Sequence, residues 1–297
     1  MTTIFFIVDG RSLEAQATLL AATLTHHNAR RHQLTAYVAD RHRDAILPST
    51  CALFDRCAVT LRALPAPPRD WRVPYAHGNK ILAASDRRPG DWGLFLDTDM
   101  ICTAPLDLAT LQIPGHVALV PEGVPTWGRE GDRWARAYAH FGLPLPEDRV
   151  RLTRRKRISF LPYFNAGFVL MPDGDVSDGR SFGQLWLETA LDFDWNAPIG
   201  GKRPWLDQIT LPLTLKRFGL GYHVAPVELN YSVSDRTYEP EARPQIMHYH
   251  RWAYLNAWPQ RQDALAALAT IAGPNLHAQL EADFGDLYHA TGLASGS

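Results

Sequence analysis

The chain has 297 residues, of which 46% are hydrophobic and 21% charged, a composition typical of a soluble globular protein that buries a sizeable core. Its formal net charge of −1 gives no support to a basic surface field, so we expect no nucleic-acid partner. The cysteines, Cys51, Cys57 and Cys102, have no metal-binding or redox spacing, and together with the lack of an export signal they favour the cytoplasm.

The beginning of the chain predicts a strand, a helix and a second strand. The apolar run "IFFIV" predicts the first strand, which ends at Val8 and Asp9, and helical spacing of apolar residues follows over 13–28. The stretch "QLTAYVAD" predicts the second strand, which ends at Asp40. This order predicts an α/β fold with a mostly parallel sheet, whose functional residues lie at the carboxyl ends of the strands.

Two carboxylates follow a buried strand in "GLFLDTDM", which comes after a predicted helix, "YAHGNKILAAS", that carries Lys80. In an extended backbone, Asp97 and Asp99 would point to the same side, and two like charges that close favour a divalent cation between them. Oxygen ligands suit Mg²⁺ or Mn²⁺. The competing interpretation is a turn in which one aspartate only caps the next element.

A basic segment at residues 149–157, "RVRLTRRKR", follows a predicted strand, "HVALVPEG", and a predicted helix, "RWARAYAHFG". Six of its nine side chains are basic. The segment fits either a solvated mobile loop or a surface that attracts a phosphorylated substrate or an acidic surface, and the sequence leaves both open.

Three later motifs place polar residues at the ends of predicted elements. In "YFNAGFVLMP", Asn165 begins a strand, where its amide suits hydrogen bonds to polyol hydroxyls. In "PWLDQ", Asp207 and Gln208 begin a helix that starts near Pro204. In "IMHYH", His248 ends a late strand, and His250 on the same face leaves the choice of a metal ligand open.

In this order, "LFLDTDM", "YFNAGFVLM", "WLDQITL" and "IMHYH" resemble the motifs of nucleotide-sugar glycosyltransferases of the GT-A fold, closest to the retaining family 8, which is glycogenin- and galactosyltransferase-like. The resemblance extends over about residues 1–255 and implies a single GT-A domain over residues 1–257. Residues 258–297 are then expected to form a C-terminal helical extension that packs on this domain.

The resemblance implies a hexosyl transfer from a nucleotide-diphosphate sugar, with UDP favoured, to the hydroxyl of an unidentified glycan, lipid or protein acceptor, with retention. It implies a Mn²⁺ or Mg²⁺ site whose ligands are Asp97, Asp99 and His248. It implies donor-binding residues at Val8, Asp9, Asp40, Lys80, Asp97, Ala166 and Gly167. It implies residues near the anomeric carbon or the acceptor at Asp207, Gln208 and Asn165.

The sequence departs from this family beyond the late histidine, where Arg251 and Tyr254 occupy the places of a glycine and of a lysine that grips the diphosphate. Arg251, or Lys202 and Arg203 after the Gly-Gly pair, could replace that lysine. The alternatives are a non-catalytic nucleotide-sugar binding protein and a sugar-phosphate nucleotidyltransferase. The second is disfavoured, because the first strand lacks a Gly-rich, Arg-containing loop.

Overall fold

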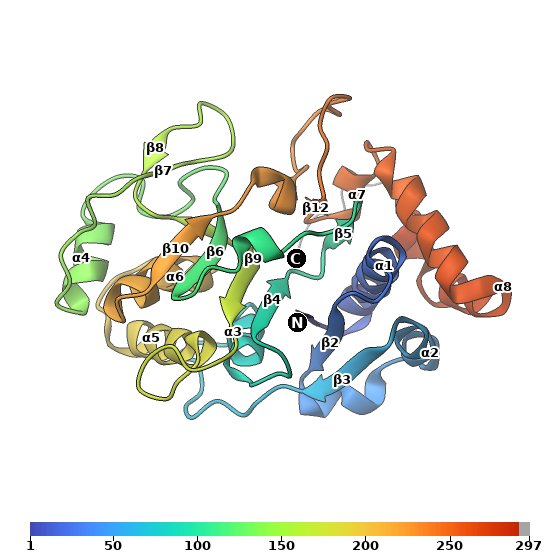
Figure 1. The fold of residues 1–297 in the computed structure, drawn as a ribbon, viewed down its shortest axis with the longest axis horizontal. Helices are drawn as coiled ribbons and strands as arrows, with labels where there is room; N and C mark the ends of the chain where they lie inside the picture. Colours follow the sequence, from blue (N-terminus) through green and yellow to red (C-terminus); the bar gives the residue numbers. More distant parts are fainter. Residues whose placement is uncertain (291–297) are drawn as a thin grey trace. The chain divides into compact units, whose positions relative to one another are not determined.

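The computed structural model describes residues 1–290, which form two compact units (Figure 1). Unit 1 comprises Met1–Thr2, Leu64–Phe95 and Leu108–Val227. Unit 2 comprises Thr3–Ala63, Leu96–Asp107 and the described residues from Glu228 onwards. The chain therefore passes between the units several times.

Unit 2 is built on a parallel sheet with strand order β1-β2-β3, in which Phe5 pairs with Thr35 and Leu34 with Val59. Every residue of β1 is buried, as expected for a strand covered on both faces. The strands are β1 (Thr2–Ile7), β2 (Gln33–Val38) and β3 (Val59–Ala63), and the helices between them are α1 (Arg11–Asn28), the short η1 (Asp40–Ala45) and α2 (Pro48–Cys57).

The rest of unit 2 is a small second sheet and a helical end. The sheet has the order β11-β12-β5, with β12 antiparallel to β5. The long helix α8 packs on α1 and α2, and it contains a kink at Gly273. These elements are β5 (Met100–Cys102), η3 (Val227–Asn230), β11 (Tyr231–Ser232), β12 (Ile246–His248), α7 (Trp252–Leu255) and α8 (Gln260–Tyr288).

Unit 1 is built on four strands in the order β10-β6-β9-β4, of which β10 and β6 are parallel and β6 and β9 antiparallel. A separate two-stranded antiparallel hairpin joins β7 and β8. The strands are β4 (Trp92–Leu96), β6 (His116–Pro121), β7 (Val150–Arg151), β8 (Ser159–Phe160), β9 (Phe164–Pro172) and β10 (Gly221–Val224).

The helices of unit 1 pack closely on one another. Helix α5 begins with a capping box between Ser181 and Gln184 and crosses α3 at Gly183, where a β-carbon would lie 1.8 Å from the carbonyl oxygen of Ala84. Only glycine permits so close a crossing. The helices are α3 (Gly78–Ser85), the short η2 (Ala109–Leu111), α4 (Arg133–His140), α5 (Phe182–Asn196) and α6 (Leu206–Arg217).

The expected fold class is confirmed: the chain is a mixed α/β protein with a large, mostly parallel sheet flanked by helices. The basic segment 149–157, for which a mobile loop was one interpretation, contains β7 and leads to β8. The domain boundary at residue 257 stays a prediction, and residues 291–297 of the expected extension lie outside the described residues. Within residues 1–290, no helix is both long and apolar enough to cross a membrane.

Candidate active site

In unit 2 the structure brings Asp97, Asp99 and His248 together. One potential ligand atom from each lies within 4.8 Å of the other two. The Nε2 atom of His248 is 3.2 Å from a carboxylate oxygen of Asp99 and 4.0 Å from one of Asp97. The histidine is 3% exposed, whereas both aspartates are partly exposed, so the group has an open side.

Local structure explains this convergence. The chain bends after β4, and the buried hydroxyl of Thr98 donates to the carbonyl oxygen of Ile7 at the end of β1, with an O–O distance of 2.6 Å. This hydrogen bond fixes the turn that carries both aspartates. The antiparallel register then pairs Met100 with His248, which places the imidazole beside Asp99. The carboxylates therefore converge through a bend rather than through an extended backbone.

The two histidines that the sequence left open differ in position. His248 is buried, and its Nδ1 atom lies 2.9 Å from Oδ1 of Asn230, so an Nδ1–H group donates to the amide oxygen. In the neutral form of this ring, Nε2 then presents its lone pair to the aspartates. His250 is exposed, stacks on the His248 ring with centroids 3.7 Å apart, and contacts the hydroxyl of Ser234 through Nδ1.

The residues fit a hard divalent cation. Two carboxylates and one neutral imidazole are ligands that Mn²⁺ and Mg²⁺ accept, and an imidazole whose other nitrogen is held by a hydrogen bond is usual at metal sites. The amide of Asn230, which the sequence analysis missed, supplies that hydrogen bond. It lies in η3, and only the fold brings it next to β12.

The residues expected to bind the base and the ribose lie after the first two strands of unit 2. Val8 is buried directly after β1, and its amide donates to the carbonyl oxygen of Tyr37. Asp9 is partly exposed and forms a hydrogen-bonded contact with Nδ1 of His42, in η1. Asp40 is exposed at the start of η1 and takes no part in this contact. His42 is a further residue that the sequence analysis missed.

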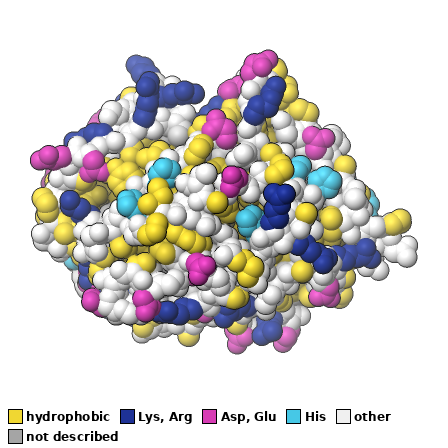
Figure 2. All heavy atoms as spheres, in the orientation of Figure 1, with side chains coloured by type: hydrophobic (Ala, Val, Ile, Leu, Met, Phe, Trp, Pro, Cys, Tyr) yellow, Lys and Arg dark blue, Asp and Glu magenta, His cyan; other side chains and the backbone are white. Residues whose placement is uncertain are grey.

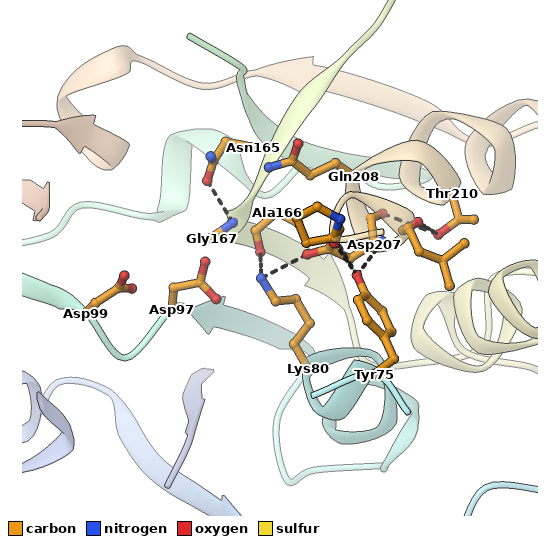
Figure 3. A network of polar contacts seen from close by, with 12 residues as sticks. Tyr75, Lys80, Asp97, Asp99, Asn165, Ala166, Gly167, Asp207, Gln208 and Thr210 are labelled. Atoms are coloured by element: carbon orange, nitrogen blue, oxygen red, sulfur yellow. Dashed lines mark hydrogen bonds and ion pairs between the residues drawn. The ribbon is translucent and has the colours of Figure 1, made fainter. Parts of the chain in front are cut away.

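In unit 1, a buried ion pair joins Lys80 of α3 to Asp207 of α6, with 3.0 Å between Nζ and Oδ2 (Figure 3). The other carboxylate oxygen lies 2.9 Å from the hydroxyl of Tyr75, which also accepts a hydrogen bond from the Asp207 amide. Nζ of Lys80 is 3.5 Å from the carbonyl oxygen of Ala166. Burial and the Asp207 charge raise the pKa of Tyr75, so this hydroxyl stays protonated.

A chain of hydrogen bonds runs beside this pair. The Tyr163 hydroxyl donates to Oε1 of Gln208 over 2.8 Å, and Nε2 of Gln208 donates to Glu122 over 2.9 Å. The same Glu122 oxygen accepts from Nδ2 of Asn165 over 2.9 Å, while Oδ1 of Asn165 accepts from the amide of Gly167. Because each side-chain amide has a donor on one side and an acceptor on the other, the orientation of both amides is fixed.

Glu122 is the carboxylate that the sequence analysis missed. It directly follows β6, in "HVALVPEG", and is partly exposed. The signal was available, since Glu122 comes at the end of an apolar run as Asp97 does. Without the antiparallel pairing of β6 with β9, however, nothing in the sequence places it next to Asn165.

Two of the three side chains that could replace the family's diphosphate-binding lysine contact other groups of unit 1. Nζ of Lys202 donates to three carbonyl oxygens, those of Phe193, Asp194 and Ala197, at 2.6 to 3.0 Å, and the side chain is 9% exposed. Of the three alternatives for the missing lysine, Lys202 is thus the one whose ammonium group stabilises the end of α5. Arg203 pairs with Asp194 at 2.8 Å and lies over the Tyr75 ring. Arg251 is exposed and precedes α7.

Comparisons with solved structures identify the fold. The galactosyltransferase LgtC, solved with donor and acceptor sugar analogs, is 14% identical, with a TM-score of 0.57 over 94% of this chain and 99% of that one. Mouse xyloside xylosyltransferase 1 is 12% identical, with a TM-score of 0.52 over 84% of this chain and 98% of that one. The bifunctional glycosyltransferase WbbM is 13% identical, with a TM-score of 0.54 over 95% of this chain and 51% of that one.

These likenesses confirm the GT-A glycosyltransferase fold that the motifs indicated. A comparison with curated proteins finds no match. The model of the Rhodobacterales glycosyltransferase domain matches residues 4–219, which is more than half of the chain. This range includes Asp97, Asp99, Lys80, Glu122, Asn165, Asp207 and Gln208, whereas Asn230, Ser234, His248, His250 and Arg251 lie beyond it. The chain belongs to the Rhodobacterales glycosyltransferase domain family, and it is a glycosyltransferase.

Proposed function

We propose that this enzyme moves a hexosyl group from a nucleotide-diphosphate sugar, with UDP favoured, to an acceptor hydroxyl, and that it requires Mn²⁺ or Mg²⁺. The observation that carries the proposal is the convergence of Asp97, Asp99 and His248 in unit 2. A bound divalent cation would neutralise the diphosphate leaving group while the glycosidic bond breaks. The three side chains would hold this cation through their carboxylate oxygens and the imidazole nitrogen.

The donor nucleotide is assigned to the strand ends of unit 2. Val8 and Asp9 lie at the end of β1, and Asp40 follows β2, as in the expected base and ribose site. The contact between His42 and Asp9 supports this role, because it holds the carboxylate in one orientation. Asp97 is assigned a second contact, to the ribose.

The sugar is assigned to the polar network of unit 1. Asn165 and Gln208 present fixed amide groups, and Ala166 and Gly167 follow on the same strand (Figure 3). Amides held in one orientation distinguish between hydroxyl positions without a reorganisation cost. We propose a catalytic role for Gln208, because its amide is held in one orientation by Tyr163 and Glu122 at the first turn of α6.

We propose retention through same-face attack rather than through a covalent intermediate. A nucleophilic carboxylate needs a free oxygen that faces the anomeric carbon. Asp207 is 2% exposed, and its oxygens are engaged by Lys80 and Tyr75. Its proposed role is therefore to hold Lys80 and the first turn of α6 under the sugar.

The acceptor is a glycan, lipid or protein hydroxyl, and we place the reaction in the cytoplasm. Free thiols at Cys51, Cys57 and Cys102 support that location. We also propose that residues 1–257 form the catalytic domain and that 258–297 are its helical extension. The packing of α8 on α1 and α2 supports this division.

The test is a screen of nucleotide-sugars by thermal shift with Mn²⁺ and with a chelator, followed by assays of donor hydrolysis and transfer. The proposal predicts that one UDP-sugar stabilises the protein only with the metal and is turned over. Metal-dependent binding without hydrolysis or transfer would instead indicate a binding protein, which is consistent with Tyr254 in the place of the family's diphosphate-binding lysine. Binding that the chelator does not change would contradict the metal requirement.

A further inference from the structure

The hairpin of β7 and β8 carries a cluster of positive charge at its tip. Arg155, Lys156 and Arg157 are exposed, and within residues 1–290 no carboxylate lies at ion-pair distance from any of them. Figure 2 shows Lys and Arg side chains protruding where this hairpin lies in Figure 1. Three uncompensated cations on one turn produce a strong local attraction for anions.

The tip has a defined backbone. Arg155 and Arg157 have φ angles of 53° and 47°, in the left-handed region, and the amide of Arg157 donates to the carbonyl oxygen of Arg154 over 3.0 Å. The amide of Leu152 donates to the carbonyl oxygen of Ile158 over 3.0 Å and closes the turn. The positive charges are therefore presented by a closed turn rather than by a free loop.

The hairpin is attached directly to the polar network of unit 1. The amide of Thr153 donates to the carbonyl oxygen of Glu122, and the amide of Arg154 donates to that of Gly123, each over 3.0 Å. The methylene chain of Arg154 lies against Gly123, where a β-carbon would be 2.7 Å from Cδ. Glu122, whose carboxylate accepts from the amides of Asn165 and Gln208, is thus bonded through its backbone to the base of the basic turn.

We propose that the tip of this hairpin, at Arg155, Lys156 and Arg157, binds an anionic group of the acceptor, a phosphate above all, next to the hydroxyl that receives the sugar. This inference rests on the proposed function, because it assigns the acceptor to the same network. Guanidinium groups bind phosphate through paired hydrogen bonds, and a lysine between them adds charge. The acceptor is then a phosphorylated glycan.

A membrane surface is the less suitable partner. Binding to anionic lipid normally combines basic residues with several exposed apolar side chains. At this tip, the exposed large hydrophobic side chain is Ile158 alone, at 39% exposure. Charge without an apolar face fits a phosphate group on a soluble acceptor better than it fits a bilayer.

The experiment compares the binding of glucose 6-phosphate and of glucose to the full chain by ligand-observed NMR. A second measurement compares binding of the full chain to phosphatidylcholine vesicles with and without phosphatidylglycerol. We expect wild type to bind the phosphate ester at least about fivefold more tightly than glucose, with the difference decreasing as salt is added. The variant Arg155→Gln/Arg157→Gln should lose that preference. Arg155→Lys/Arg157→Lys should keep part of it.

The matched control is Arg31→Gln/Arg43→Gln, which removes two exposed arginines of unit 2 and should keep the preference. Gly123→Ala, which displaces Arg154, tests the attachment and should weaken binding of the ester. Equal binding of ester and glucose by wild type, or a preference that survives in the Gln variant, would overturn the inference. Binding of the chain to anionic vesicles without a preference for glucose 6-phosphate would also overturn it.

Mn²⁺-dependent binding of UDP separates this inference from the proposed function. The Gln variant should bind UDP as wild type does. If it binds UDP more weakly, the turn grips the donor diphosphate, and the assignment to the acceptor is wrong. If wild type does not bind UDP with Mn²⁺, the proposed function fails, whatever the sugar phosphate does.

Discussion

The amide oxygen of Asn230 lies 2.9 Å from Nδ1 of His248, and both side chains are at least nine-tenths buried. This contact fixes which imidazole nitrogen faces Asp97 and Asp99. Asn230 is therefore a positioning residue for the proposed metal site, although it contributes no ligand.

Replacing Asn230 by alanine should weaken Mn²⁺ binding about 10- to 100-fold, because the imidazole loses its fixed orientation. Mn²⁺ binding measured by electron paramagnetic resonance checks this without any substrate. The control is Ser234→Ala, which alters the environment of exposed His250 and should leave Mn²⁺ affinity close to that of wild type. An unchanged affinity in Asn230→Ala would show that the hydrogen bond has no part in metal binding.

The two histidines give a second prediction. His248→Ala should abolish the tight Mn²⁺ site, because Nε2 of His248 lies 3.2 Å from Asp99 and 4.0 Å from Asp97. His250→Ala should have a small effect, because this side chain is exposed and stacks on the His248 ring. Calorimetric titration with Mn²⁺ distinguishes the two. Loss of binding only in His250→Ala would reassign the ligand.

The buried ion pair in unit 1 should be costly to break from either side. Asp207→Asn leaves the Lys80 ammonium buried without its counter-charge, and we expect a loss of about 3–5 kcal/mol in the free energy of unfolding. Urea denaturation measures this loss in Asp207→Asn, in Lys80→Met and in the double variant. The double variant should lose less free energy of unfolding than the two single variants lose in sum. Additive losses would mean that the two groups do not interact.

The exposed pair between Arg87 and Asp175 offers the matching control in the same unit. Asp175→Asn should change stability far less, because water already solvates both groups. An equal loss in Asp175→Asn and Asp207→Asn would contradict the role assigned to burial.

Much of this site follows from local sequence patterns. Asp97, Asp207 and Asn165 were placed correctly at the ends or beginnings of their elements, because strand ends and helix starts have strong local signatures. Glu122 and Asn230 were missed, since their roles depend on pairings between segments far apart in the sequence. The sequence left Lys202 open as a replacement for the missing lysine for a related reason, because its carbonyl partners at the end of α5 are set by packing.

The hydroxyl of Tyr75 supports Asp207, and Tyr75→Phe should cost about 1–3 kcal/mol of stability. The variant removes the one O–H proton that the carboxylate of Asp207 and the carbonyl oxygen of Pro204 share, and it also removes the acceptor of the Asp207 amide. Since burial raises the pKa of Tyr75, absorbance of wild type at alkaline pH should show this phenol resisting ionisation. Ionisation of all tyrosines together near their usual pKa, before unfolding, would contradict the burial of this group.

Acid should destabilise the protein partly through His32. Burial lowers the pKa of His32 below its value in the unfolded chain, so the unfolded state takes up the proton first. The contribution is complete above the unfolded pKa of about 6.5 and is lost as the pH falls through that value towards the folded one. His32→Gln should therefore show a shallower loss of stability between about pH 7 and pH 5 than wild type, measured by urea denaturation.

The most direct test of the central claim is calorimetric titration of UDP into wild type and into Asp99→Asn, each with Mn²⁺ and with a chelator. The metal site predicts that Mn²⁺ tightens UDP binding to wild type by about tenfold or more, because a cation held by the carboxylates would attract the negatively charged diphosphate. In Asp99→Asn that enhancement should disappear while binding without metal stays unchanged. If Asp99→Asn binds UDP as tightly as wild type with the same dependence on Mn²⁺, the assignment of Asp97, Asp99 and His248 as the metal site is wrong.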